Sequence, residues 1–231
     1  MDEREENPFN DELIAKEWIN SVENEKGRTR DREVYPYLKA WALDLGPSNV
    51  IVEIGAGQGI CAEKLDCDAT YIGVEPSVTL VERAKEKYGA PNRTFVLGDA
   101  YELPIANGVA DAVISINVLF HLEDLEKSST ELQRILKLQG KFLIVSANPD
   151  AYDIWESFYE LPQKEGKKLV GKVNIPVNPL SRNTMFQHSQ LEIRNALESA
   201  GLQITYIKYM GLHSEKFTKP IFVVIEGSKS S

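Results

Sequence analysis

Between residues 49 and 146, short β-branched segments alternate with amphipathic segments about every 20 residues. The run 112–116 is almost wholly apolar, which is typical of a strand that helices cover on both faces. Such alternation predicts an α/β fold with a doubly wound, mostly parallel sheet. The predicted strands of this part are residues 49–54, 70–75, 94–97, 112–116 and 141–146, and the predicted helices include residues 78–88 and 122–138, the latter capped by Gly140.

The two flanking regions have different patterns. Residues 1–45 have helical apolar spacing. The segment from Tyr152 to Tyr159 is aromatic, with Trp155, Phe158 and Tyr159 on one helical face, and therefore predicts another helix. The C-terminal region predicts a helix over residues 190–200 and two strands, residues 204–209 and 221–225, whose short link makes the last strand antiparallel.

Composition limits the classes of partner. The chain has 231 residues, 42% of them hydrophobic and 26% charged, as in one globular domain with an insertion. The net charge of −9 argues against binding to nucleic acid or to an anionic membrane. No apolar run approaches the roughly 18 residues of a membrane span, the N-terminus lacks signal-peptide order, and Cys61 and Cys67 are too few for a disulfide framework. We expect a cytoplasmic protein without nucleic-acid or membrane partners; the oligomeric state stays open.

The first predicted strand runs directly into Gly55, Gly57 and Gly59 and then into a helix. Glycine permits a tight turn and lets a ligand lie against the backbone, and a helix start offers free N–H groups to an anion. Glu75 ends the second predicted strand 20 residues after Gly55, a spacing at which a carboxylate can accept the hydroxyls of an adenosine ribose. Asp99 follows the third strand on the same edge. Since ligands of open α/β sheets bind at this edge, these positions predict a nucleotide-type site.

The glycine spacing separates classes of nucleotide. A phosphate-binding P-loop would need Lys and Ser or Thr where Ile60 and Cys61 stand. The dinucleotide pattern would place its third glycine at position 60, one residue after Gly59. Three alternatives remain open: a tight turn without a ligand, a nicotinamide-dependent oxidoreductase, and a non-catalytic nucleotide-binding protein of the same fold.

The segments EIGAGQG, GVEPS, GDAYELP and DAVISINVLFHL resemble the class I S-adenosylmethionine-dependent methyltransferases, above all their small-molecule branch. The resemblance covers roughly residues 45–150. It implies a Rossmann-like methyltransferase fold of seven strands with a helical lid, S-adenosylmethionine as cofactor, and methyl transfer to an O, N or C atom of a small molecule. The expected single domain comprises an N-terminal helical lid (1–45), a cofactor-binding half (46–149), an insertion or second lid (150–186), and a C-terminal helix and hairpin (187–227).

The resemblance implies roles for residues around the methionine part of the cofactor. The backbone of Gly55, Ala56 and Gly57 would hold this part. Glu53 would orient the turn or reach the amino group through water. The backbone carbonyl of Asn117 would lie near the same amine, with an ordinary helix-start residue as the alternative.

It also implies roles at the nucleoside end. Glu75 would accept the ribose hydroxyls. Asp99 would accept from the adenine amine and the Ala100 amide would donate to the ring, although Asp99 could instead cap its turn. Pro76 and Leu119 would form walls of the adenine and methyl-side pockets.

The segment after the fourth strand bears on the acceptor. Residues 117–120 lack the paired prolines typical of enzymes that methylate amino groups, which argues against that branch. This segment offers only Asn117 as a metal ligand, so we expect no metal. His121 is a candidate general base, with a packed helix-start residue as the alternative. One of Arg28, Arg30 and Arg32 would reach the cofactor carboxylate. Aromatic residues in both lids predict either lid packing or an aromatic or hydrophobic acceptor.

Overall fold

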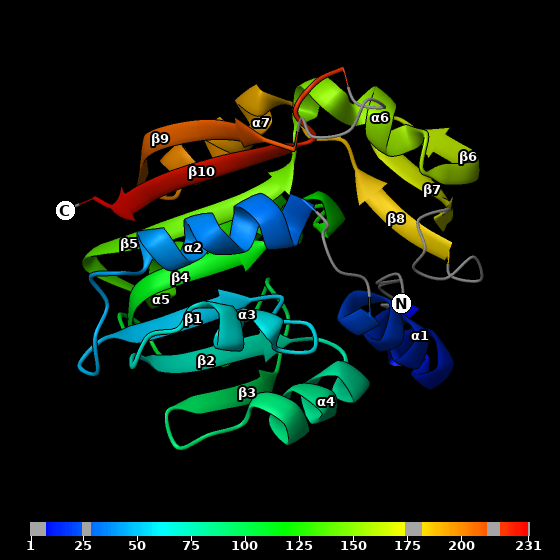
Figure 1. Ribbon diagram of the computed structural model, residues 1–231. Coiled ribbons are helices and arrows are strands. Elements are labelled where there is room, and N and C mark those ends of the chain that lie inside the picture. The colour runs from blue at the N-terminus through cyan, green and yellow to red at the C-terminus, as the bar shows by residue number, and fades with distance from the viewer. Residues whose placement is uncertain (1–7, 25–28, 174–181, 212–217, 231) are drawn as a thin grey trace.

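A computed structural model describes residues 8–24, 29–173, 182–211 and 218–230. Seven strands form one sheet in the order β3-β2-β1-β4-β5-β10-β9 (Figure 1). Neighbouring strands are parallel from β3 to β5, and β10 is antiparallel to both β5 and β9. The predicted α/β class, the mostly parallel seven-stranded sheet and the C-terminal antiparallel pair are therefore confirmed. The strands are β1 (Val50–Ile54), β2 (Thr70–Glu75), β3 (Arg93–Leu97), β4 (Ala110–Ile116), β5 (Leu136–Ala147), β9 (Leu202–Met210) and β10 (Phe222–Lys229).

The point where the strand order reverses lies between β1 and β4. From β1 the chain moves outward to β2 and β3, and then returns to place β4 on the other side of β1. Glu53 of β1 accordingly pairs in register with Gly73 on one side and Ile114 on the other. The loops that leave β1 and β4 therefore diverge at the carboxyl edge, which is where open α/β sheets bind ligands.

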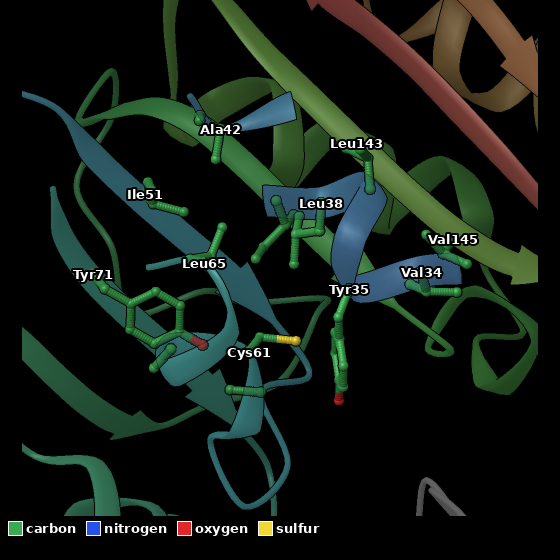
Figure 2. Close-up of a cluster of buried hydrophobic side chains, with 14 of the residues drawn as sticks. Val34, Tyr35, Leu38, Ala42, Ile51, Cys61, Leu65, Tyr71, Leu143 and Val145 are labelled. Carbon is green, nitrogen blue, oxygen red and sulfur yellow. The ribbon is translucent and has the colours of Figure 1, made fainter. Parts of the chain in front are cut away.

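Helices cover both faces of the sheet. Helices α2 (Tyr35–Trp41), α3 (Ile60–Lys64) and α4 (Val78–Tyr88) pack on one face through a buried cluster that Figure 2 shows in part. Helices α5 (Leu125–Ile135) and α7 (Gln190–Ser199) pack on the other face through a second buried cluster. Within the described ranges, no helix is long and apolar enough to cross a bilayer.

Two further units lie at the carboxyl edge, to which the arrowheads of the parallel strands point (Figure 1). One is the N-terminal segment, with η1 (Pro8–Asn10), α1 (Glu12–Asn24) and η2 (Arg30–Val34). The other is a three-stranded antiparallel sheet, here called the lid sheet, made of β6 (Tyr159–Glu165), β7 (Lys168–Val173) and β8 (Arg182–Phe186).

The aromatic helix predicted from Tyr152 to Tyr159 is wrong beyond its first turn. Helix α6 spans only Tyr152–Glu156, and Tyr159 already begins β6. Pro162 and Gly166, which has a φ of +57°, do not suit a continued helix. The lid sheet instead buries one face, including Tyr159, against Phe120 of the main fold.

The predicted helix 122–138 and its glycine cap also need correction. Helix α5 ends at Ile135, and Gly140 lies inside β5. The pairing with β4 is irregular here, since Ala110 pairs with Leu136 and Ala112 with Lys141. Leu136 is fully buried in the sheet core, and this burial favours early strand pairing over another helical turn.

Candidate functional site

The turn that follows β1, residues 55–59, is here called the glycine turn. Gly55 and Gly57 have φ values of +73° and +53°, in the left-handed region that glycine adopts without strain. A Cβ on Gly55 would overlap Val118 Cγ2, so the loop after β4 packs directly on the turn. A Cβ on Gly57 would meet no atom within 4 Å. The turn therefore has open space beside Gly57, where a ligand can approach the backbone.

Glu75 is held against this turn. Its Oε2 accepts a hydrogen bond from the Gly57 N–H at 2.9 Å, and its Oε1 accepts one from the Ser77 N–H at 3.0 Å. The side chain is buried, and burial raises the pKa of the Glu75 carboxyl to about 7, although both backbone bonds oppose the shift. The structure thus brings together the glycine turn and the acid that the sequence places 20 residues later.

Glu53 lies beneath the turn and is also buried. The Tyr71 hydroxyl donates to its Oε2, and the Cys61 thiol interacts with the same carboxylate and stabilises its charge. Burial raises the pKa of Glu53 to about 7, the two donors oppose this shift, and the nearby Glu75 reinforces it. Sequence reasoning did not find Tyr71 or Cys61 as partners of Glu53, because only the register of β1 on β2 and the packing of α3 on the sheet show that they meet.

The turn after β3 contains Asp99 and Ala100. Asp99 Oδ1 accepts from the Tyr101 N–H at 2.7 Å and from the Glu102 N–H at 3.0 Å, so this oxygen caps the turn, as the alternative prediction has it. Ala100 is buried beside it, and Pro76 is exposed in the neighbouring loop after β2. The structure therefore places these residues on the same edge as Glu75.

Asn117 begins the loop after β4 with an unusual backbone conformation and a side-chain oxygen left unsatisfied by the described residues. Its φ is +60°, and its N–H donates to the Val145 carbonyl at 2.8 Å. Its Oδ1 is buried, and no described residue donates to it. A buried amide oxygen without a donor is costly, and such oxygens mark places where a ligand or water completes the hydrogen bonding. Leu119, two residues on, is buried in the core on the α5 face.

The N-terminal segment covers the glycine turn. Gln58 Nε2 donates to the Ile19 carbonyl of α1 at 3.4 Å, and the Ser77 hydroxyl donates to the Phe9 carbonyl at 2.5 Å. Glu23 near the end of α1 pairs with Arg83 at 3.0 Å and with Lys87 at 2.8 Å on α4. These contacts use backbone carbonyls and distant ion pairs, so no local sequence pattern could have revealed them.

His121 connects the main fold to the lid sheet. Its Nδ1 lies 2.8 Å from the Thr184 carbonyl oxygen of β8. A carbonyl only accepts, so Nδ1 carries the proton and Nε2 of the neutral ring keeps its lone pair. Burial lowers the pKa of His121, although the bond to Thr184 opposes the shift. Both features suit a proton acceptor at the carboxyl edge.

His188 makes a second connection between these parts. Its Nε2 lies 2.6 Å from the Leu122 carbonyl oxygen, and the ring is buried. Among the residues that the structure describes, no three His, Cys, Asp or Glu side chains come close enough to hold a metal ion. Arg28 and His213 lie outside the described residues.

Comparison with known proteins finds similarity to methyltransferases. A family model described as a methyltransferase domain matches residues 52–144. An uncharacterized methyltransferase of Anoxybacillus flavithermus is 33% identical over 111 residues, 46% of this chain and 51% of that relative. The ubiquinone/menaquinone biosynthesis C-methyltransferase UbiE of Caulobacter sp. strain K31 is 27% identical over 140 residues, 52% and 55% of the two chains. Residues 52–144 therefore match a methyltransferase domain, in agreement with the resemblance to the class I S-adenosylmethionine-dependent methyltransferases.

Solved structures agree with this methyltransferase fold. One similar chain comes from the Haloferax volcanii complex between the Trm112 methyltransferase activator and a methyltransferase, with a TM-score of 0.69, 17% identity, and coverage of 96% of this chain and 98% of that one. At this identity the likeness shows the fold alone. The chain spans about half the length of the two curated methyltransferases named above.

The matched methyltransferase domain indicates the class of cofactor. The cofactor is S-adenosylmethionine, as the resemblance implies. The nicotinamide-dependent alternative is therefore set aside. The open space at Gly57, the buried Glu75 carboxylate and the lone Asn117 Oδ1 fit a ligand that carries hydroxyl and ammonium donors.

Proposed function

We propose that this chain transfers the methyl group of S-adenosylmethionine to a small-molecule acceptor bound between the carboxyl edge, α1 and the lid sheet. The observation that carries the proposal is the Glu75 carboxylate held by the Gly57 N–H beside open space. When bound, the cofactor supplies an activated methyl group on a sulfonium. The protein's contribution is then to position both partners and to exclude water.

Glu75 and the turn after β3 are assigned to the nucleoside. Each Glu75 oxygen already accepts one backbone N–H, and a carboxylate has about four lone-pair sites, so the ribose hydroxyls can donate to the same oxygens. Asp99 and the Ala100 amide are assigned to adenine, with Pro76 as a wall of that pocket. The Asp99 turn presents them on the edge that also carries Glu75.

The glycine turn and Asn117 are assigned to the methionine part. The backbone of Gly55, Ala56 and Gly57 forms the cradle, and Glu53 orients it from below. The amino group would donate toward Asn117, by its backbone carbonyl and its lone Oδ1. The contact between Val118 and Gly55 supports this assignment, because it keeps the loop after β4 on the glycine turn.

Arg30 is assigned to the cofactor carboxylate. Its Nε is buried without a hydrogen-bond partner among the described residues, and its side chain is 16% exposed. Its guanidinium lies 5.3 Å from the centre of the Tyr35 ring, and Nη2 reaches the Val22 carbonyl at 3.4 Å. Arg30 belongs to the N-terminal segment, and a guanidinium with an unused N–H donor there suits a carboxylate ligand.

His121 is assigned to the acceptor. With Nδ1–H bonded to Thr184, Nε2 can take a proton from an acceptor hydroxyl or amine as the methyl group arrives. An acceptor that loses no proton needs no such base. Three aromatic side chains pack on one another beside the lid sheet: Phe120, Trp155 and Phe158. Their rings give this region an apolar surface, which suits an apolar acceptor.

Calorimetry tests the proposal. The chain is titrated with S-adenosylmethionine, S-adenosylhomocysteine and NAD, and methyl transfer is then screened with apolar and aromatic hydroxyl and amine compounds. We expect both adenosyl ligands to bind and NAD not to bind. Absence of adenosyl-ligand binding would contradict the proposal, and binding without transfer to any compound would favour the non-catalytic alternative.

A methyltransferase that works only with a bound activator protein is a second candidate, since one similar structure comes from a complex with the activator Trm112. The net charge of −9 argues for small acceptors over nucleic acid. Transfer that occurs only to a protein or RNA, and only with an activator of that kind, would favour this candidate.

A further inference from the structure

Four buried polar side chains from four elements meet beneath the glycine turn. They are Glu53 of β1, Tyr71 of β2, Cys61 of α3 and Tyr35 of α2, and none is more than 6% exposed. Figure 2 shows Cys61 between the rings of Tyr71 and Tyr35. Polar groups this deeply buried persist only when they satisfy one another, so the cluster needs a structural or functional reason.

The four side chains interact in a row that converges on the carboxylate. The Tyr71 hydroxyl donates to Glu53, the Cys61 thiol interacts with the same carboxylate, and the Tyr35 hydroxyl interacts in turn with the Cys61 sulfur. The Tyr71 ring is held in place by Phe95, whose ring centre lies 5.6 Å away. The carboxylate therefore has a fixed donor in Tyr71 and a second polar neighbour in Cys61.

The chain position of these residues links the cluster to the cofactor cradle. Glu53 precedes Gly55 by two residues, and Cys61 follows Gly59 by two residues. The interaction between Cys61 and Glu53 therefore links the two ends of the glycine turn. Tyr71 acts on the same carboxylate from the neighbouring strand.

The charged groups around the cluster set its preferred protonation. Glu75 on β2 faces Glu53 and disfavours a second negative charge, whereas Arg30 on η2 favours negative charge at Cys61. The two donors to Glu53 favour its ionised form. An ionised carboxylate beneath the turn favours a ligand that carries a positive charge, as the ammonium group of the cofactor does.

We propose that Tyr71 and Cys61 are positioning residues of the cofactor site, which hold Glu53 ionised and fixed beneath the glycine turn so that it favours the cationic end of the cofactor. This inference rests on the proposed function and adds two residues that never touch the ligand. Their removal must change the pH dependence of binding and not only its strength.

The test uses Tyr71→Phe in the full chain, with S-adenosylhomocysteine as the probe. Its dissociation constant is measured by calorimetry between pH 6 and pH 9 for the wild type and the variant. Losing a donor raises the pKa of Glu53, so the variant needs a higher pH to reach full affinity. We expect binding about tenfold weaker than wild type at pH 6.5 and within about twofold of wild type at pH 8.5.

Cys61 provides a second, independent pair of variants. Cys61→Ala removes the donor and should shift the profile in the same direction as Tyr71→Phe. Cys61→Ser keeps a donor and should retain the wild-type profile. Tyr209→Phe, at a tyrosine 41% exposed on β9, is the matched control and should change nothing.

An equal loss of affinity for S-adenosylhomocysteine at every pH, or a pH profile of binding that does not shift, would overturn the inference. Either result would leave the proposed function intact. If Tyr71→Phe does not fold, the contrast between Cys61→Ala and Cys61→Ser decides. If the wild type itself fails to bind S-adenosylhomocysteine, the proposed function falls and this inference falls with it.

Discussion

The cofactor side of the carboxyl edge and the lid side hold their geometry by different means. On the cofactor side, backbone groups make the key contacts: the N–H groups of Gly55 and Ala56 donate to the Val74 carbonyl at 2.8 and 3.0 Å, and Gly57 donates to Glu75. On the lid side, packing of side chains on Phe120 and the contact from His121 to β8 hold the lid sheet.

This difference has a functional meaning. A cofactor shared by a whole family needs one fixed constellation of donors and acceptors, and a turn with bound backbone groups supplies it. An acceptor differs from enzyme to enzyme, and side-chain packing can change without altering the main sheet. The two sides should therefore respond independently to mutation, and the following predictions test that independence.

The largest expected effect is on the lid side. Met185 is fully buried in the cluster between the lid sheet and Phe120. Met185→Ala should lower the free energy of opening the lid sheet by about 2–5 kcal/mol, because it removes buried apolar contacts and leaves a cavity. Hydrogen exchange of β7 and β8 should accelerate, while binding of S-adenosylhomocysteine stays within about twofold. A collapse of cofactor affinity would show that the two sides are not independent.

Glu75→Gln should give the largest effect on the cofactor side. The variant keeps the size but turns one acceptor oxygen into a donor that faces a backbone N–H or a ribose hydroxyl. We expect S-adenosylhomocysteine to bind about 10–100-fold more weakly, the scale of hydrogen bonds to a charged group. Affinity for a 2′-deoxy analogue should fall much less between wild type and variant. If the analogue loses as much affinity as the parent compound, Glu75 does not touch the ribose.

Asn117→Gly separates backbone strain from ligand binding. Glycine accepts the φ of +60° without strain but removes the lone Oδ1. We expect cofactor affinity to fall about threefold to tenfold while the melting temperature stays equal or rises. Gln139→Gly, at a φ of +63° in β5, is the control and should leave affinity unchanged. Equal affinity in both variants would remove the Asn117 side chain from the cofactor site.

The smallest expected effect is on the contact between the N-terminal segment and α4. Glu23 pairs with Arg83 and Lys87 across α1 and α4, in a partly exposed network of the kind that contributes little to stability. Glu23→Gln should therefore leave the melting temperature almost unchanged but raise the dissociation rate of the cofactor about twofold to threefold in stopped-flow measurements. Glu198→Gln, which breaks an exposed pair within α7, is the control. An unchanged rate would mean that α1 does not limit cofactor release.

The sequence was informative where structure is local and less so where distant segments meet. The alternation of strands and helices predicts the seven-stranded sheet, and the glycine spacing with Glu75 predicts one wall of the site. The lid sheet was missed because its buried face is completed by Phe120, more than 30 residues before Tyr159 in the chain. The partners of Glu53 were missed because Tyr71 depends on the register of β1 against β2 and Cys61 on the packing of α3 against the sheet. The roles of individual residues toward the cofactor stay predictions.

The lid sheet leaves the main fold and returns to it at nearly the same point. The Tyr152 hydroxyl, at its entry, donates to the His188 carbonyl at its exit, at 2.9 Å. Asn148 anchors the entry separately, donating to the Pro220 carbonyl at 2.7 Å. A segment whose two ends are clasped in this way is a unit that recombination can exchange whole. Over evolutionary time, a lineage can thus acquire a new acceptor by replacing one stretch of gene while it inherits the cofactor cradle unaltered.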